Sequence, residues 1–140
     1  MSLEIRAYHR DDEADVIELW RTCELTRGWN DPARDIARKL TVQPELFVVA
    51  LDDRTIVGSL MAGFDGHRGW LNYLAVVDTH RRRGIARALV REAEQRLHAL
   101  GCPKINLQVR PENDAAVGFY ARLGYIKEPR LNFGKRLIDD

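Results

Sequence analysis

The sequence predicts an α/β fold with a mixed sheet, in which antiparallel strands come first and a parallel pair follows. The chain has 140 residues, a length that favours one domain and allows about two-thirds of the unfolded surface to be buried. Three apolar runs in its middle are joined by short polar turns, which indicates an antiparallel meander. A strand-like run, a long amphipathic segment and a further strand-like run then follow, which indicates a right-handed parallel crossover.

The first third of the chain is predicted to hold one strand and two helices. Residues 3–8 form a short strand, and Asp11 or Asp12 caps the first helix. The sequence Gly-Trp-Asn-Asp-Pro at 28–32 ends that helix, and its aspartate and proline begin the second as N-cap and first helical residue. The apolar positions of the two helices, three and four residues apart, are Val16, Leu19, Trp20 and Cys23, and Ala33, Ile36, Ala37 and Leu40.

The remaining elements follow from apolar runs and from the glycines that end helices. A polar turn at 52–54 and a hairpin turn at 65–69 separate the three central strands. Gly101 and Gly124 each follow an amphipathic segment, as helix-ending glycines do. The predicted elements are strands over 46–51, 56–64 and 70–77, a helix over about 84–100, a strand over 104–109, a helix over about 114–123, and one or two strands over 125–138.

Composition excludes several classes of function. The 22 Lys and Arg residues nearly balance the 21 Asp and Glu residues, so no overall field attracts nucleic acid or an acidic membrane. No stretch is long and apolar enough to span a membrane. Cys23 and Cys102 lack the spacing of zinc ligands. We therefore expect two buried, reduced thiols, no metal, and a cytoplasmic location.

The run Arg81-Arg82-Arg83-Gly84-Ile85-Ala86 carries the strongest functional signal. It lies between the strand over 70–77 and the long helix that follows. A helix that begins on glycine and alanine leaves its first N–H groups unobstructed, and the helix dipole and the arginines add positive charge there. Such a strand-to-helix junction, at the carboxyl end of a parallel strand, is suited to bind the phosphates of a small anionic ligand.

These residues match two blocks of a known family. The pattern Arg81-x-x-Gly84-x-Ala86 resembles the Q/R-x-x-G-x-G/A signature of the GNAT family of N-acetyltransferases. Downstream, Asn113 and the pattern Tyr120-x-x-x-Gly124-Tyr125 resemble that family's second block. The order of elements also fits along essentially the whole chain. The resemblance implies a single acetyltransferase domain over residues 1–140, a splayed parallel pair of strands, helices on both faces, and acetyl-CoA as acyl donor.

The resemblance also implies roles for individual residues. The diphosphate of CoA would bind backbone N–H groups of residues 82–87, and its pantetheine arm would pair with the strand at residues 74–76. The N–H of Leu74 would stabilise the oxyanion, and Tyr120 would protonate the departing thiolate. The alternative for Tyr120 is packing beside Phe119 and Leu123, and Asn113 is an N-cap, a pantetheine contact, or both. The residues placed at the cofactor are Leu74, Ala75, Val76, Arg81, Arg82, Arg83, Gly84, Ile85, Ala86, Arg87, Asn113 and Tyr120.

The chain departs from the family pattern at the general base. Trp70 occupies the position of the glutamate base of histone-directed members, and neither Asn72 nor Tyr73 is a ready base. The missing base favours an acceptor amine of low pKa, or a proton relayed by water. The candidate relays are Glu24, Asp31 and His67, each of which also has a structural explanation. The candidates for the acceptor pocket are Trp29, Asn30 and Trp70.

Three functions compete at this point. The first is direct transfer of an acetyl group to a primary amine of a small molecule or peptide, in a ternary complex and by a monomer or homodimer. The second is a non-catalytic sensor that binds acyl-CoA without turnover. The third, nucleic-acid binding through Arg81–Arg83 and Arg87, is disfavoured by a net charge of +1.

Overall fold

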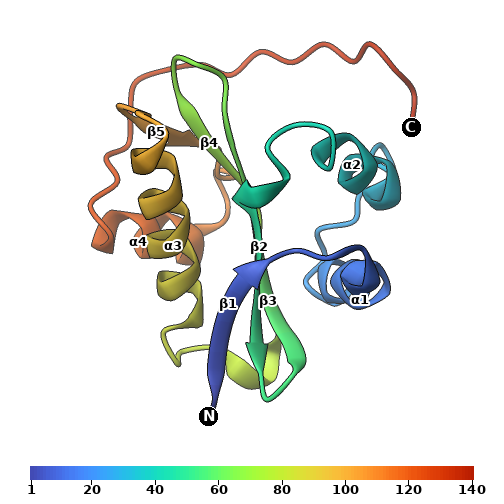
Figure 1. Cartoon of the computed structure of the whole chain (residues 1–140). Coiled ribbons are helices and arrows are strands. Elements are labelled where there is room, and N and C mark those ends of the chain that lie inside the picture. Colours follow the sequence, from blue (N-terminus) through green and yellow to red (C-terminus); the bar gives the residue numbers. More distant parts are fainter. The chain divides into compact units, whose positions relative to one another are not determined.

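Five strands form one mixed sheet in the order β1-β2-β3-β4-β5 (Figure 1). The computed structural model describes residues 1–140, which form two compact units, residues 1–107 and 108–140. Strands β1 to β4 are antiparallel neighbours, and β5 pairs with β4 in parallel. The predicted mixed sheet is therefore confirmed. The strands are β1 (Leu3–Ala7), β2 (Phe47–Asp52), β3 (Thr55–Phe64), β4 (Gly69–Val76) and β5 (Ile105–Leu107).

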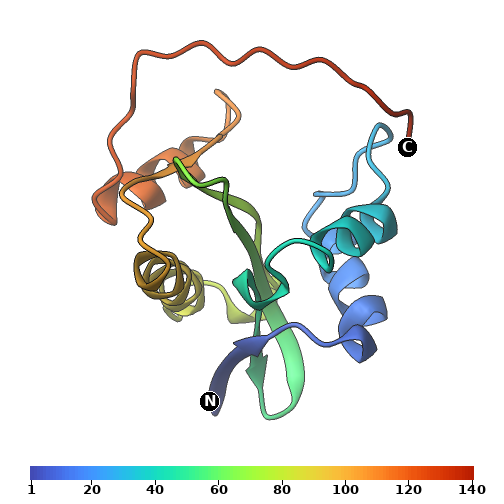
Figure 2. The ribbon, with the colours of Figure 1, turned by 45° about the horizontal axis from the view of Figure 1, so that its top comes forward.

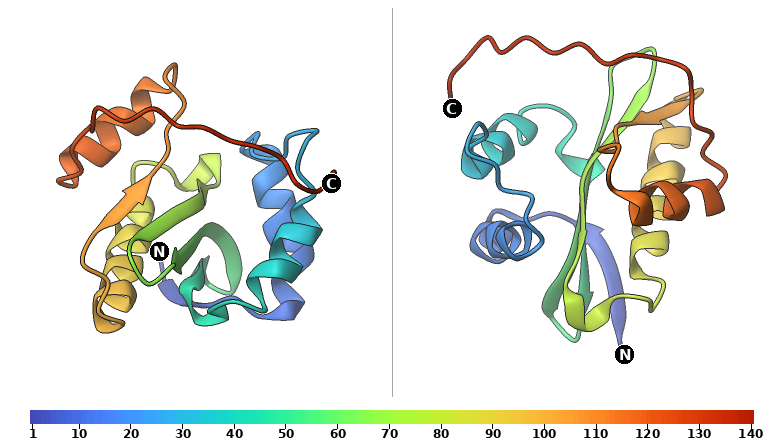
Figure 3. Two further views of the ribbon diagram at one scale, coloured as in Figure 1. Left: turned by 90° about the horizontal axis from the view of Figure 1, so that it is seen from above. Right: turned by 180° about the vertical axis from the view of Figure 1, so that it is seen from behind.

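Helices cover both faces of this sheet, as predicted. Helices α1 (Glu13–Thr22) and α2 (Pro32–Lys39) lie on one face, and α3 (Ile85–Ala99) lies on the other (Figures 2 and 3). Three short 3₁₀ turns, η1 (Arg10–Asp12), η2 (Pro44–Leu46) and η3 (Asp78–His80), connect strands and helices. None of the helices is long and apolar enough to cross a membrane.

Stacked aromatic rings form the core between α1 and the sheet. Trp20 of α1 is fully buried and lies between two rings of the sheet: Tyr73 at a centroid distance of 3.8 Å and Phe47 at 6.0 Å. Phe47 in turn stacks on Tyr8 at 4.4 Å. Such pairs add about 0.5–1.5 kcal/mol each beyond the area that they bury.

Helix α3 packs very closely on the opposite face, because β3 has a glycine beneath it. A Cβ atom on Gly58 would lie 3.0 Å from Leu89 Cδ1 and 3.1 Å from the carbonyl oxygen of Ala75. Contacts this short leave no room for a side chain. Gly58 therefore lets α3 lie close against β3.

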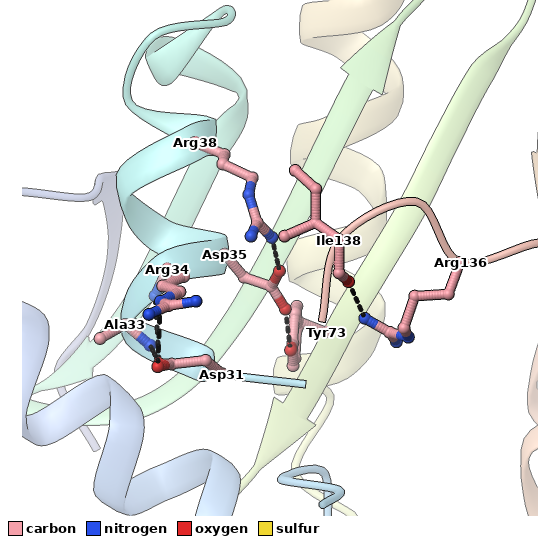
Figure 4. Close-up of polar contacts among 8 residues, drawn as sticks. All are labelled: Asp31, Ala33, Arg34, Asp35, Arg38, Tyr73, Arg136 and Ile138. Atoms are coloured by element: carbon pink, nitrogen blue, oxygen red, sulfur yellow. Dashed lines mark hydrogen bonds and ion pairs between the residues drawn. The ribbon is translucent and has the colours of Figure 1, made fainter. Parts of the chain in front are cut away.

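Asp31 caps α2 as predicted. Its carboxylate accepts hydrogen bonds from the backbone N–H groups of Ala33, at 2.9 Å, and Arg34, at 3.2 Å (Figure 4). The predicted apolar face of α2 is only half right, however. Ile36 is buried, but Ala33 and Ala37 are exposed and the buried neighbour is Lys39.

Asp12 precedes α1 without capping it through its side chain. Its carboxylate instead accepts hydrogen bonds from the backbone N–H of His9, at 2.8 Å, and from the Arg6 guanidinium, at 2.8 and 3.0 Å. It therefore joins the end of β1 to the start of α1. Burial alone would raise the pKa of Asp12, but these hydrogen bonds outweigh burial and hold the pKa below its ordinary value.

The second unit contains one helix and a long extended tail. Helix α4 (Asp114–Arg122) is capped by Asn113, whose side-chain oxygen accepts from the Ala116 N–H at 3.1 Å. No strand forms after α4, so the prediction of one or two strands over 125–138 is wrong. Strand β5 is also shorter than predicted. Both cysteines are free but only half-buried, whereas full burial was expected.

Asp12→Asn should lower the free energy of unfolding by about 1–2 kcal/mol at pH 7, because hydrogen bonds to a charged group are lost. The pKa of Asp12 is depressed in the folded state, so its stabilisation is present above the unfolded pKa of about 3.9 and is lost as pH falls through the folded pKa. Urea unfolding between pH 7 and pH 2.5 should show the gap between wild type and variant closing below about pH 4. Glu13→Gln, at the exposed start of α1, is the control and should change little. An unchanged gap at low pH would contradict this role.

Candidate active site

Strand β4 is interrupted on both of its edges at the same level. It pairs with β5 only from Gly69 to Leu71, so its second half has no strand on that edge. Towards β3 the register steps from Asn72 to Ala75 while β3 advances by two residues, from Met61 to Ser59. This is a β-bulge, in which two residues of β4 oppose one of β3.

The bulge lies at Tyr73 and Leu74, which together oppose Leu60 of β3. Tyr73 has a φ of 55°, a left-handed conformation that bulky residues rarely adopt. Below the bulge, the Val77 N–H donates to the carbonyl of Val57 on β3 at 2.9 Å. Because backbone groups alternate along a strand, Val76 turns its own N–H and C=O to the unpaired edge, whereas Ala75 faces β3, where it pairs with Ser59.

The loop between β4 and α3 forms a concave row of backbone N–H groups. Arg82 and Gly84 have φ angles of 63° and 81°. The first hydrogen bond of α3 runs from the Ala88 N–H to the Gly84 carbonyl, at 3.0 Å. The N–H groups of residues 85–87 therefore precede any backbone acceptor within the helix. A Cβ atom on Gly84 would meet nothing within 4 Å, so the space beside Gly84 is open. Such an arrangement binds anions.

The four arginines around this loop differ in whether they form ion pairs and hydrogen bonds within the protein. Arg81 forms an ion pair with Asp78 at 2.8 Å, and its Nε donates to the Val76 carbonyl at 3.1 Å. It therefore ties the loop to the end of β4. Arg82, Arg83 and Arg87 are exposed and form no ion pair, so their charges face solvent beside the open N–H groups. Ile85 is buried in the core and offers only its backbone to a ligand.

Tyr120 lies on α4, in the second unit. Its ring makes edge contacts with Phe119, at a centroid distance of 5.0 Å, and with Tyr125, at 5.6 Å. Burial raises the pKa of Tyr120 to about 12, because the charged phenolate would lose its water. The phenol is therefore protonated throughout the neutral range. Asn113 has the predicted capping role, through the hydrogen bond described above.

The three candidates for the acceptor pocket lie in two places. Trp29, which is 53% exposed, and Asn30, which is half-buried, lie between α1 and α2. Trp70 is the second residue of β4, and its indole N–H donates to Asp65 in the β3–β4 hairpin at 3.3 Å. Trp70 thus stabilises this hairpin. It is also the residue that aligns with the glutamate base of histone-directed family members.

The candidate proton relays are engaged in structural contacts or exposed. Asp31 caps α2, and the His67 ring nitrogen Nδ1 lies 3.4 Å from the Arg68 guanidinium in an exposed turn. Glu24 is exposed just after α1, with a φ of 59°. None of the three forms a hydrogen bond or ion pair with β4 at its bulge.

Sequence reasoning missed a carboxylate that does reach the bulge. The Tyr73 hydroxyl donates to Asp35 of α2 at 2.6 Å, and Asp35 also pairs with Arg38 at 3.1 Å (Figure 4). No motif marks Asp35, because it is one of several charged residues on a short helix. Only the stacking of α2 above the sheet brings it to β4.

Comparison with known proteins agrees with this geometry. A model of the acetyltransferase (GNAT) family matches residues 8–125. An acetyltransferase of Yersinia pestis (strain Pestoides F) is 51% identical over 138 residues, which are 99% of this chain and 98% of that protein. These two findings establish the family.

Two solved structures share the fold. The NatC complex bound to Gag peptide and CoA matches with a TM-score of 0.82 and 25% identity, over 94% of this chain and 89% of that chain. An aminoglycoside acetyltransferase from an uncultured soil metagenomic sample matches with a TM-score of 0.74 and 25% identity, over 99% of this chain and 100% of that chain. The chain therefore belongs to the GNAT family of acetyltransferases, and it is an acyltransferase.

Proposed function

We propose that this enzyme transfers an acetyl group from acetyl-CoA to a primary amine, by direct attack within a ternary complex. The observation that carries the proposal is the row of unpaired N–H groups at the start of α3, open in front of Gly84 and flanked by three unpaired arginines. The family match runs across both units, which supports one acetyltransferase domain over residues 1–140.

In this proposal, the diphosphate of CoA binds the backbone N–H groups at the start of α3. Residues 82–87 supply the backbone donors, and each charge-assisted hydrogen bond contributes about 1.5–3 kcal/mol. Arg82, Arg83 or Arg87 reaches the 3′-phosphate, since only these three arginines of the loop have free charges. Arg81 instead holds the loop against β4 and supports binding indirectly.

The pantetheine arm lies along the unpaired edge of β4. Its amides pair with backbone groups there, as an added strand does. Val76 turns its backbone to this edge, although its carbonyl already accepts from Arg81. Leu74 lies in the bulge and offers its N–H to the thioester carbonyl. Ala75 faces β3 and shapes the edge rather than binding the arm through its backbone.

Transfer then needs a neutral amine and a proton donor for the thiolate. The amine attacks the thioester carbon, the Leu74 N–H stabilises the oxyanion, and Tyr120 protonates the leaving sulfur. Since a CoA thiol has a pKa of about 8.5, Tyr120 assists a leaving group that is already tolerable. Its own high pKa keeps the required proton in place at neutral pH.

The acceptor is a primary amine of a small molecule or a peptide. The two solved structures above illustrate both classes, since one is bound to a peptide and the other is an aminoglycoside acetyltransferase. Neutralising a lysine near pH 7.4 costs about 4 kcal/mol, whereas an α-amine costs about 0.5 kcal/mol. With Trp70 in place of a base, we favour an amine of low pKa. Trp29 and Asn30 shape its pocket, and their loop sets the choice of acceptor.

The free thiols of Cys23 and Cys102 suit a reducing compartment, so we place the reaction in the cytoplasm. A monomer or a homodimer satisfies every role assigned above.

Gly84→Glu should abolish measurable binding of CoA in calorimetry, because the new carboxylate enters the space that the diphosphate would occupy and repels it. Gly101→Glu is the matched control. Gly101 ends the same helix with a φ of 85°, close to the 81° of Gly84, and has equally open surroundings. Both variants carry the same backbone strain and charge, so only the position differs. Equal loss of binding in both variants, or retained binding in Gly84→Glu, would contradict the proposed phosphate site.

The arginine that binds the 3′-phosphate can be found by comparing CoA with 3′-dephospho-CoA. We expect one of Arg82→Gln, Arg83→Gln and Arg87→Gln to lose the preference for CoA by about tenfold, the equivalent of one charge-assisted hydrogen bond. Its affinity for dephospho-CoA should stay unchanged. Arg91→Gln, further along α3 and paired with Glu94, is the control. The same preference in all four variants would refute an arginine contact with this phosphate.

Tyr120→Phe should lower kcat by at least about tenfold, because the thiolate then leaves without a proton donor. The pH profile gives a second measure. Since the pKa of Tyr120 is about 12, its acid form persists at pH 10, and kcat of the wild type should hold its plateau there. An acid with an ordinary pKa of about 10 would be deprotonated in half of the enzyme molecules at that pH. A variant with the full rate would exclude Tyr120 as the acid.

A further inference from the structure

Trp20 and Ser59 form a buried polar pair in an otherwise apolar core. Both side chains are fully buried. The indole N–H of Trp20 donates to Ser59 Oγ at 2.8 Å, and Ser59 Oγ donates to the backbone carbonyl of Tyr73 at 2.9 Å. A polar group buried this deeply is costly unless its hydrogen bonds are satisfied. An apolar side chain would fill this space equally well, so we look for a role in the hydrogen bonds that the pair makes.

The chemistry of the groups sets the direction of this chain of hydrogen bonds. An indole nitrogen can only donate, so the Ser59 oxygen must accept from Trp20. The hydroxyl has a single proton, which is thereby left for the Tyr73 carbonyl. The Trp20 donor also polarises the hydroxyl and strengthens its bond to Tyr73. The carbonyl of Tyr73 is consequently held towards β3.

The planarity of the peptide bond passes this orientation to Leu74. In a trans peptide the C=O of one residue and the N–H of the next point in opposite directions, and every peptide of this chain is trans. With the Tyr73 carbonyl directed at Ser59 on β3, the Leu74 N–H points away from β3. On that side β4 has no strand partner beyond Leu71. The N–H therefore faces the unpaired edge.

This peptide needs such a restraint, because it belongs to the bulge. Tyr73 has a φ of 55°, which a bulky residue keeps only when its surroundings impose it. Two further contacts hold the same residue. Its ring stacks on Trp20 at 3.8 Å with an interplanar angle of 11°, and its hydroxyl donates to Asp35 at 2.6 Å. Trp20 thus restrains Tyr73 twice, through its ring and through Ser59.

We propose that Ser59 and Trp20 are positioning residues for acyl transfer, which hold the Tyr73–Leu74 peptide with its N–H aimed at the thioester oxygen. This inference rests on the function proposed above. In that reaction the amine nitrogen forms a bond to the acyl carbon, and the electron pair of the C=O bond moves to oxygen, where the Leu74 N–H stabilises it. The C–S bond then breaks, the thiolate takes a proton from Tyr120, and the amine nitrogen releases its extra proton to water.

Ser59→Ala tests the inference, because it removes the hydroxyl and little else. We expect kcat to fall by about tenfold to a hundredfold, the scale of a misdirected oxyanion donor. The Kd for CoA should stay within about twofold, since the N–H row at α3 is untouched. Trp20→Phe keeps an aromatic ring but removes the indole donor, and it should cause a smaller loss of kcat. Ser59→Thr restores the hydroxyl and should recover most of the rate.

Val57→Ala is the matched control for a purely structural effect. Val57 lies two residues from Ser59 on β3 and is also buried. It should lower the urea midpoint at least as much as Ser59→Ala does and leave kcat within about twofold. Equal losses of kcat in both variants, a rise in KM with kcat unchanged, or a wild-type kcat in Ser59→Ala would overturn the inference.

An NMR measurement separates this inference from the proposed function. Acetyl-CoA should move the Leu74 amide proton downfield in the wild type, and much less in Ser59→Ala. That shift requires no turnover. A wild type that shows the shift but acetylates no amine would contradict the proposed function alone. Turnover by the wild type, with identical Leu74 shifts and identical kcat in Ser59→Ala, would overturn the positioning role alone.

Discussion

The bulge in β4 is the constraint on which the geometry of this enzyme rests. One additional residue at Tyr73 and Leu74 breaks the ladder to β3, and at the same level the ladder to β5 has already ended. A regular strand would bury all of its N–H groups in the sheet. Here the Tyr73–Leu74 peptide lies where both ladders are interrupted, and the side chain of Ser59 holds its carbonyl. The cost is a tyrosine at positive φ, about 1–3 kcal/mol by the usual scale for such strain.

The loop between β4 and α3, where we propose that phosphate binds, is tied to the same strand. Helix α3 begins shortly after β4 ends, and Gly58 lets the helix lie close against the sheet. Arg81 joins the loop to the Val76 carbonyl. The open N–H groups of α3 and the unpaired edge of β4 thus belong to one compact unit. In the proposed complex, acetyl-CoA is held by its phosphates at the loop and its other end is directed along β4. This arrangement lowers the entropic cost of aligning the thioester.

Local patterns in the sequence predicted most of the fold and marked the loop that we propose as the phosphate site. Spacing located the buried residues of α1, such as Val16 and Trp20, and Asp31 marked the start of α2. Where burial depends on distant partners, the same reasoning failed. Lys39 is buried and Ala37 exposed, because α2 turns the face that carries Ile36 and Lys39 towards the sheet. The strands predicted after residue 125 failed because alternation cannot show whether a strand edge receives the segment.

The polar contacts around the bulge could not be predicted, for a related reason. Trp20 and Ser59 are 39 residues apart, and Asp35 and Tyr73 are 38 apart. Neither pair has a local spacing to reveal it. Both arise only when the register of β3 and β4 and the packing of the helices are known. Ser59 did carry a faint signal, as a lone hydroxyl in an apolar strand, which must find a partner when buried. The proposed phosphate site consists of adjacent residues, so a motif can reveal it. The proposed orientation of the Tyr73–Leu74 peptide depends on residues that only the fold brings together, and a motif search is least able to find such residues.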